Sequence, residues 1–545
     1  MKTFAVCLSL VAGVSAQSAA AHVNDARSHG VVGDAFLSLE EGIRLLNEQL
    51  ALSELSAAER GQIMGQGAVR TVVLEVGVTP VVTLERLLTP LDGPPVRERV
   101  QILGHGQAGS PVLVASGQAV GLAIRTNHAH VHGLTIRGGQ VGLVADTSVQ
   151  RYVGEMLELM DVAFEAQTEV GLRLQSPRTP TDVMLLRASF TDQATAIAVD
   201  DRAGGGTVML NARHLQFRSV QLGLDVFCDA DGGMTMCEIY HAHMTASTQF
   251  LRSRRALTNS RLVMLMLRAC DVETTGDVAD VQGNAFGETF FHHHHSTLRP
   301  GMGRRAIRLW PQDGRFDFHG SENLVYGDVD IASGRLSRRL WVWNSIFRNS
   351  TITISNAGTR PSLRWNRFEK STLRAASGNS TQLAVASSEF YGCVIDGQSS
   401  AGPIVLENAW LETSTQTGSV QVYNPAPSPW LSHCDVSTGT PQLGGFVDLV
   451  LELPPGMAGV WHFGLGDTQP LLTEEPWRFY ALRQTLVQLP GVSIFRTTLR
   501  LPIPVVRSIV GVEFYAQPVT VPFLGQAHVP AMNLPRGAYL TPQAP

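Results

Sequence analysis

The sequence predicts an all-β chain built mainly from a parallel β solenoid, with a helical cap before it and an antiparallel β-sandwich after it. Two series of short apolar strands recur at a nearly constant interval and stay in step with each other. Within these strands apolar and polar residues alternate with a period of two rather than 3.6. Composition agrees, because the 52 glycines and 28 prolines make up about 15% of 545 residues and charged residues only 16%.

Six strand-like runs between residues 133 and 272 define the first series. Each run ends in a large apolar residue, and the end residues are 28, 26, 27, 27 and 28 positions apart: Ile136, Phe164, Phe190, Phe217, Met244 and Val272. The second series follows the first five runs, at 141–144, 170–174, 196–199, 222–226 and 249–251. This pattern is typical of a solenoid, in which each coil buries its apolar face only against neighbouring coils.

The interval shortens after residue 340. Runs that end at Phe347, Phe368, Phe390 and Trp410 are separated by 21, 22 and 20 residues. Two asparagines fall at matching positions of these runs, which predicts a ladder of stacked side chains at one turn: Asn344 and Asn366. Helical repeats are the competing class, and the period of two and the many β-branched residues and glycines argue against them.

A helix is expected before the solenoid. The segment 36–47 and its extension carry a helical stripe of apolar residues: Leu39, Ile43, Leu46 and Leu50. Ser38 and Glu41 have the spacing of a capping box, and a second short helical stretch is expected within 53–67. An open terminal coil exposes an unpaired strand edge, so this helix is expected to cover the first coil. An ordinary surface helix is the alternative.

The first residues have the pattern of a secretion signal. Lys2 precedes an apolar run from Phe4 to Val14, and small residues suit cleavage after Ala16. The run is too short for a membrane span, and no later stretch approaches about 18 uninterrupted apolar residues. The sequence therefore predicts an exported protein, soluble or attached to a surface by something other than a transmembrane helix. An N-terminal core helix is the alternative.

Five of the six cysteines follow that cleavage site. Cys228 and Cys237 bracket the turn 229–233, and a local disulfide between them is one expectation in an oxidising compartment. Buried thiols are the alternative. The remaining three cysteines are too scattered to be paired from sequence.

From about residue 444 the pattern changes. Proline and aromatic residues become dense, and longer apolar runs appear at 446–453, 461–465 and 505–515. Separate strands with Pro-Gly turns predict a small antiparallel β-sandwich.

These strands and intervals make residues 68–435 resemble the right-handed parallel β-helices of the pectate-lyase-like superfamily, whose secreted bacterial members carry recurring Gly-Leu-x-Val and Asn-Ser-x-Phe phrases. The segment 38–47 is similar to the SLREAI phrase of bacterial surface β-helix proteins, with Gly42 in place of its alanine and a glutamate in place of its arginine. The phrase 511–518 resembles a C-terminal module of secreted planctomycete-like proteins.

The expected organisation is a signal peptide at 1–16, a linker and helical cap at 17–67, the β-helix at 68–435 and a β-sandwich module at 436–545. The fold implied by the resemblance hosts lyases, hydrolases, epimerases, adhesins and inert scaffolds. The resemblance therefore implies no single activity.

Polar residues of the first series are expected to line one outer face, because stacked coils place equivalent positions about 4.8 Å apart. Elimination at a uronic acid needs a base with a pKa near neutrality and a cation that stabilises the enolate. His241 or His243, with His214 beside them, is the candidate base, and Arg187 or Arg218 the candidate cation. The candidate substrate-binding residues are Asp161, Glu165, Asp271 and Glu273. The alternative is a solvated face with cross-strand ion pairs such as Asp161–Arg187.

Two further groups are candidate metal ligands. In the run 292–295 alternate side chains of an extended chain face opposite ways, so His292 and His294 would chelate from one side. Asp225, Asp229 and Asp231 are rich in oxygen ligands but lack the final glutamate of a calcium loop. No cofactor is certain, and calcium is the ion this second group would take. A polar surface loop is the alternative for the histidines.

Two functions stay open. Missing catalytic motifs and low charge favour a non-catalytic, exported or cell-surface scaffold or adhesin that contacts glycans. The alternative is a polysaccharide-active enzyme, a uronic-acid polysaccharide lyase ahead of a hydrolase, that works in the outer groove. A net charge of −5 without a basic block argues against nucleic-acid binding. The expected partners are extracellular polysaccharides or cell-surface components.

Overall fold

The computed structural model divides by internal contacts into two compact units, Met1–Cys237 with Met244–Ala256, and Glu238–His243 with Leu257–Pro545. It describes the following residues: 18–24, 32–75, 87–88, 100–105, 112–115, 117, 119–124, 129–146, 156–175, 181–201, 207–228, 233–255, 261–283, 287–310, 315–321, 323–333, 340–356, 361–376, 382–398, 402–426, 433–438, 444–452, 457–466, 482–491, 496–502, 505, 514–522 and 538–540.

The first unit begins with a strand and a helical cap. Strand β1 (Ala19–Val23) pairs in parallel with β3 (Val69–Glu75) and antiparallel with β2 (Ile63–Met64). Between them lie α1 (Leu39–Leu46), the 3-10 helix η1 (Leu52–Glu54) and α2 (Ala57–Arg60). The signal peptide and its cleavage site lie outside the described residues.

The capping box at α1 is confirmed. The Ser38 hydroxyl accepts a hydrogen bond from the Glu41 amide at 3.2 Å, and the Glu41 carboxylate accepts one from the Ser38 amide at 2.8 Å. Gly42 explains a departure from the SLREAI phrase, because a Cβ atom there would lie 3.1 Å from Val72 and 3.2 Å from Val23. Glycine thus lets the helix lie close on β1 and β3.

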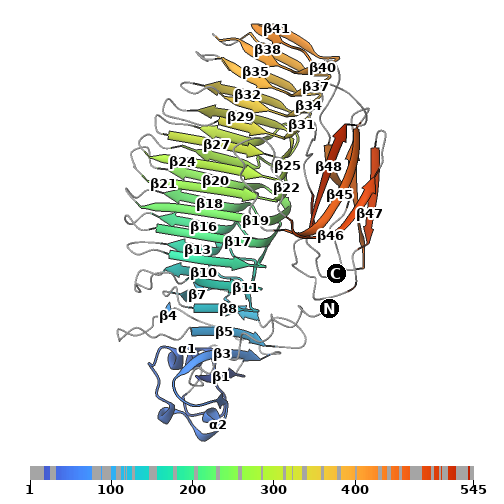
Figure 1. The fold of residues 1–545 in the computed structure, drawn as a ribbon. Helices are drawn as coiled ribbons and strands as arrows, with labels where there is room; N and C mark the ends of the chain where they lie inside the picture. The colour runs from blue at the N-terminus through green and yellow to red at the C-terminus, as the bar shows by residue number, and fades with distance from the viewer. Residues whose placement is uncertain are drawn as a thin grey trace. The chain divides into compact units, whose positions relative to one another are not determined.

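The first unit then forms parallel coils (Figure 1). The long strands are β5 (Val100–His105), β8 (Ala129–His132), β11 (Leu157–Met160), β14 (Thr181–Leu186) and β17 (Thr207–Arg218). The short strands are β6 (Val112–Val114), β9 (Thr135–Arg137), β12 (Ala163–Glu165) and β15 (Ser189–Thr191). The long strands pair into one ladder and the short strands into a second. A third ladder holds β4 (Leu87–Leu88), β7 (Val120–Ile124), β10 (Val141–Asp146), β13 (Val170–Gln175), β16 (Thr195–Asp201), β18 (Leu222–Cys228) and β20 (Gln249–Arg255). Strand β19 (Met234–Ser247) carries residues of both units.

The second unit repeats this arrangement. Its long strands are β21 (Leu262–Arg268), β24 (Glu288–His294), β27 (Arg315–Ser321), β30 (Leu340–Trp343), β33 (Ser362–Arg364), β36 (Leu383–Ala386), β39 (Ile404–Glu407) and β42 (Val420–Tyr423). Its short strands are β22 (Asp271–Thr274), β25 (Thr297–Arg299), β28 (Leu324–Tyr326), β31 (Ile346–Arg348), β34 (Arg367–Glu369), β37 (Glu389–Tyr391) and β40 (Trp410–Glu412). Its third ladder holds β23 (Ala279–Gln282), β26 (Arg305–Trp310), β29 (Asp328–Ser333), β32 (Thr351–Asn356), β35 (Thr372–Ala375), β38 (Val394–Gly397) and β41 (Thr415–Gly418).

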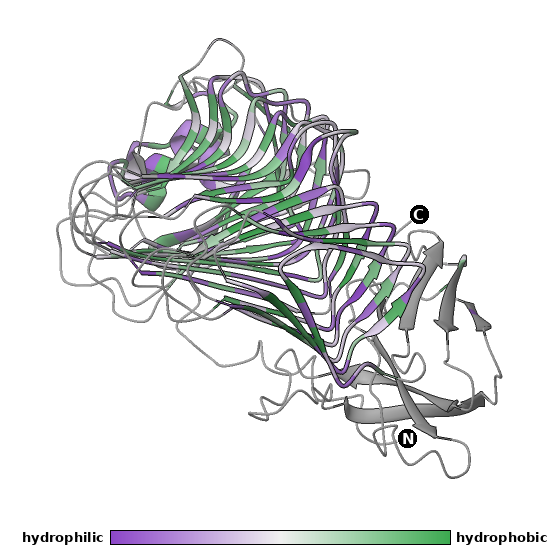
Figure 2. Cartoon of the chain, turned by 90° about the horizontal axis from the view of Figure 1, so that it is seen from above, coloured by the Kyte–Doolittle hydropathy of each residue, from purple (hydrophilic) through white to green (hydrophobic). Residues whose placement is uncertain are grey.

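These ladders are parallel in the register that the sequence predicts. Phe164 lies opposite Ile136 and Phe190, and Leu172 lies opposite Leu143 and Ile197. All six end residues of the first series are buried, whereas the intervening side chains are more exposed. Figure 2 shows this alternation of apolar and polar residues along the strands. The chain is therefore a parallel β-helix, as predicted.

The C-terminal residues switch to antiparallel sheets. Strands β43 (His433–Thr438), β44 (Phe446–Glu452) and β47 (Arg496–Pro502) form one sheet. Strands β45 (Met457–Gly466), β46 (Leu482–Gly491), β48 (Phe514–Pro522) and β49 (Ala538–Leu540) form the other. The last parallel strand ends at Tyr423, so β43 is already antiparallel before the expected boundary at 435.

The asparagine ladder differs from the prediction. Phe347 lies opposite Phe368, so the partner of Asn344 is Trp365, not Asn366. Asn344 sits at a bend with φ of 48°, while Asn366 is fully buried one position further on. The observed ladder alternates serine and asparagine, each side chain accepting a hydrogen bond from the backbone of the preceding coil: Ser296, Asn323, Ser345, Asn366 and Ser388. We call it the serine–asparagine ladder.

Two other predictions need correction. Leu411, not Trp410, lies opposite Phe390, so the last interval is 21 residues and Trp410 lies beside Glu389 instead. Cys228 and Cys237 are buried thiols and are not joined by a disulfide. The Cys228 sulfur instead lies 3.3 Å from the Thr235 hydroxyl within the core.

Among the described residues, no helix is long and apolar enough to cross a membrane.

Candidate functional site

The row of candidate residues around Asp161 lies at backbone bends. Asp161, Arg187, His214 and His241 have φ values of 53° to 57°, the left-handed conformation in which the chain turns from a long to a short strand. The Asp161 carboxylate accepts hydrogen bonds from Arg187 at 2.6 and 2.7 Å and lies 2.8 Å from His132 Nε2. This is the cross-strand ion pair that the sequence offered as the alternative to a catalytic row.

This pairing fixes the charge states of both partners. Burial of the Asp161 carboxylate favours its neutral form, but the hydrogen bonds and charges of Arg187 and His132 outweigh burial and hold the pKa of Asp161 below its usual value. The hydrogen bond to Asp161 raises the pKa of Arg187. The Arg187 side chain is thus held in an ion pair with Asp161 of the neighbouring coil.

The remaining candidates of the first unit lie in the outer row of the short strands. Glu165 pairs with Arg137 at 2.7 Å, and Thr191 lies opposite both Glu165 and Arg218. Because His241 and His243 belong to the second unit, a groove that combines them with Arg187, His214 and Arg218 stays a prediction.

In the second unit, His243 and Asp271 come together. His243 Nδ1 lies 3.4 Å from one Asp271 oxygen, and Arg299 lies 2.7 Å from the other. Burial would raise the pKa of Asp271, but contacts with His243 and Arg299 outweigh burial and lower it. Glu273 follows Asp271 by two residues on β22 and lies opposite Arg299 in the outer row.

The outer row continues through the later coils, and sequence reasoning missed this part. The residues following Glu273 recur after 26, 27, 22, 21 and 22 positions, at Arg299, Tyr326, Arg348, Glu369 and Tyr391. Extending the predicted row by one coil interval at a time would have found them. We call the connected set the outer ladder, of which Glu389 is the one fully buried member: Asp271, Arg299, Tyr326, Arg348, Arg367, Glu369, Glu389 and Tyr391.

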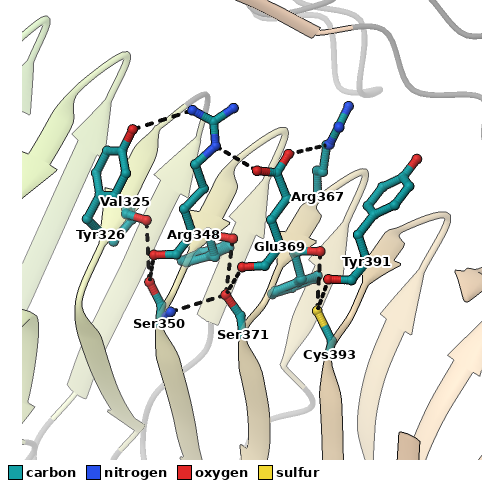
Figure 3. Close-up of polar contacts among 11 residues, drawn as sticks. Val325, Tyr326, Arg348, Ser350, Arg367, Glu369, Ser371, Tyr391 and Cys393 are labelled. Atoms are coloured by element: carbon teal, nitrogen blue, oxygen red, sulfur yellow. Dashed lines mark hydrogen bonds and ion pairs between the residues drawn. The ribbon is translucent and has the colours of Figure 1, made fainter. Parts of the chain in front are cut away.

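Figure 3 shows five members of this set, Tyr326, Arg348, Arg367, Glu369 and Tyr391. The Arg299 guanidinium lies 5.7 Å from the Tyr326 ring centre, and Arg348 donates to the Tyr326 hydroxyl at 3.4 Å. Glu369 accepts a hydrogen bond from Arg348 and forms an ion pair with Arg367, both at 2.7 Å. The Tyr391 hydroxyl donates to Glu389 at 3.0 Å, and the Arg367 guanidinium lies 4.7 Å from the Tyr391 ring centre.

The same contacts shift the pKa values of Arg348 and Tyr391. Burial opposes the charge of Arg348, but Tyr326 and Glu369 outweigh burial and raise the pKa of Arg348. Burial, followed by the negative charge of Glu389, raises the pKa of the Tyr391 hydroxyl, which therefore stays protonated. At neutral pH, Arg348 is thus charged and the Tyr391 phenol is neutral.

We expect Glu369→Gln to lower the free energy of unfolding by about 2 kcal/mol, because it leaves two partly buried guanidinium groups without their anion. The side chains of Glu369, Arg348 and Arg367 are 20–24% exposed. The matched control is Glu165→Gln, whose pair with Arg137 is more exposed and should contribute at most about 1 kcal/mol. Urea unfolding measures both, and equal losses would contradict the prediction.

The candidate calcium site is not supported at Asp225. Its carboxylate accepts from Arg252 at 2.8 Å and from Arg254 at 2.7 Å, so two cations already lie where calcium would bind. Asp229 and Asp231 lie outside the described residues.

The other candidate metal ligands do come together. His292 and His294 lie on the outward side of β24, and His319 from β27 lies opposite His292 in the parallel ladder. One ring nitrogen from each lies within 4.8 Å of the others. We call these three residues the histidine cluster. Sequence reasoning missed His319, although it follows His292 by 27 residues, which is one coil interval.

Comparisons with known proteins identify no family. No family model matches the chain, and no curated protein matches it. A solved structure that is similar is a variant of the catalytic domain of a GH87 α-1,3-glucanase in complex with tetrasaccharides, at 12% identity and a TM-score of 0.18. The match covers 66% of this chain and spans 63% of that one. The function of the chain must therefore be argued from its own residues.

Proposed function

We propose that the protein is an exported β-helix that binds neutral polysaccharide along the outer ladder without cleaving it. The observation that carries this proposal is the side-chain network of Figure 3, in which polar and aromatic groups of successive coils hold each other in place. The signal-like N-terminus supports export, since the pattern around Lys2 and Ala16 suits signal-peptidase cleavage.

Charge balance indicates the class of polysaccharide. The outer ladder holds three arginines and three carboxylates, and their formal charges cancel. A polyuronate is strongly anionic and would be attracted by an excess of positive charge, which this ladder does not supply. A neutral glycan instead needs hydrogen-bonding groups and ring faces, which arginine, glutamate and tyrosine side chains offer together.

Order within the ladder favours binding. Glu369 is held by two arginines, and Tyr391 by Glu389 and Arg367, so little rotamer freedom is left to lose when a ligand binds. Repetition at one coil spacing of about 4.8 Å extends these groups in a line, which suits a long polymer better than a small molecule.

Incubation of the mature chain with soluble neutral glucans, mannans, xylans and polyuronates tests this proposal. We expect retardation in affinity electrophoresis with at least one neutral polymer, and no release of reducing ends or unsaturated uronates from any. Failure to bind any neutral polymer, or turnover of one, would contradict it.

A uronic-acid lyase is the second candidate, favoured by the contacts of His243. A carboxylate that orients a histidine is a common way to prepare a general base, and Asp271 lies in that position, with Arg299 on its other oxygen. In this case unsaturated uronates should appear, and His243→Ala should abolish them. His241→Ala, at the neighbouring bend, is the matched control and should retain activity.

A further inference from the structure

We propose that the histidine cluster binds a zinc ion. His292, His294 and His319 supply three imidazoles and leave the fourth position of a tetrahedral site open to water or to a ligand oxygen. The cluster lies on the long strands β24 and β27, whereas the outer ladder lies on short strands, so this site is separate from the proposed glycan-binding residues.

The backbone brings the three side chains to one point for simple geometric reasons. His292 and His294 are two positions apart, so both point outward from β24 while His293 points into the core. Parallel pairing puts His319 beside His292. Zinc–nitrogen bonds of about 2.0–2.1 Å place tetrahedral ligands about 3.4 Å apart. Small side-chain rotations therefore close the present separations of up to 4.8 Å.

Ring orientation distinguishes this cluster from ordinary stacking. The ring planes of His292 and His294 make angles of 78° and 85° with His319 and 75° with each other. Elsewhere His130 and His132 have the same two-residue spacing on β8, but their planes differ by only 8° and their faces stack. Stacked rings present faces to each other, whereas crossed rings are able to direct nitrogen atoms to a shared point.

Neighbouring residues supply the support that metal-binding histidines usually have. His294 Nδ1 lies 2.7 Å from the Ser321 hydroxyl, a contact that orients the imidazole ring. His319 is packed by Trp341 and Trp343, at ring-centre distances of 5.6 and 5.3 Å. A hydrogen-bonded ring and an apolar wall both hold ligands in a fixed orientation.

Ligand chemistry favours a transition metal ion over calcium or magnesium. Imidazole nitrogen suits zinc, copper, nickel and iron, while calcium and magnesium require oxygen. Zinc accepts three histidines and one water in tetrahedral geometry. It therefore fits the cluster without a further protein ligand.

The test uses the mature chain, purified without a polyhistidine tag and stripped with a chelator. Calorimetric titration with Zn²⁺ should show one site, and Co²⁺ at that site should give the visible absorption of a tetrahedral ion. His319→Gln and His294→Gln should each weaken binding at least about 100-fold, and Ser321→Ala about 10- to 100-fold. His130→Gln is the matched control and should bind as the unmodified chain does.

Circular dichroism of each metal-free variant establishes that it is folded. If His319→Gln does not fold, His294→Gln decides the result, because His294 is less buried than His319. Absence of saturable Zn²⁺ binding by the unmodified chain would overturn the proposal. Unchanged affinity and stoichiometry in a folded variant of the cluster would overturn it as well.

Discussion

Phe368→Ala should lower the free energy of unfolding by about 4 kcal/mol, the largest loss we expect from one substitution. Phe368 is fully buried between Phe347 and Phe390, with ring-centre distances of 5.2 and 4.7 Å and nearly parallel planes. Truncation removes the apolar contacts and leaves a cavity that stacked coils on both sides are poorly able to fill. Urea unfolding followed by tryptophan fluorescence measures the loss.

Phe36→Ala is the control for this substitution. Phe36 is 51% exposed, so its truncation removes little buried surface and should cost less than about 1 kcal/mol. A loss for Phe368→Ala no greater than the loss for Phe36→Ala would show that the phenylalanine stack is not part of a packed core.

Asn366→Ala should cost about 3 kcal/mol, the second largest effect. The Asn366 side chain accepts a hydrogen bond from the Ser345 amide at 3.0 Å and donates one to the Val342 carbonyl at 2.8 Å. Alanine leaves both backbone groups buried without these bonds, and each lost partner costs about 1–3 kcal/mol. The effect should appear as a lower urea midpoint with an unchanged slope.

Asn344→Ala is the matched control. Asn344 lies at a bend, where alanine only loses the preference of asparagine for the left-handed conformation, worth about 1 kcal/mol. A serine at 366 should restore part of the stability, because serine fills this position at Ser345 and Ser388 of adjacent coils. Equal effects at 344 and 366 would contradict the observed register.

The fold could be predicted from sequence because each coil repeats one requirement. Each coil buries a large apolar residue against the equivalent residue of the next coil. The positions of Phe164, Phe190 and Phe217 therefore indicate the coil interval. Register errors of one residue arose where two similar residues were adjacent. Trp410 stands next to Leu411, and only the paired strands show that Leu411 faces the core line of Phe390.

Candidate sites were harder to predict because their members lie far apart in sequence. His292 and His294 were found as a local run, but His319 joins them only through the pairing of β24 with β27. The pair of Asp161 with Arg187 was foreseen because the coil interval of the first series was clear, whereas His132 as a further partner of Asp161 was not. The row from Arg299 to Tyr391 was not followed into the shorter coils. The backbone bends at His214 and His241 were not predicted, although histidine, like asparagine and aspartate, is enriched in the left-handed conformation.

The central claim is that the outer ladder is the surface that binds polysaccharide, and its most direct test is the dissociation constant of a ladder variant. For the neutral polymer that binds best, the double variant Tyr326→Ala with Arg348→Ala should bind at least about 10-fold more weakly, a change of 1.4 kcal/mol. Arg374→Ala removes an arginine that is also ion-paired, to Asp396 at 3.0 Å, but lies on β35 of the third ladder. It should bind as the unmodified chain does. Equal affinity of the folded double variant and the unmodified chain would contradict the claim.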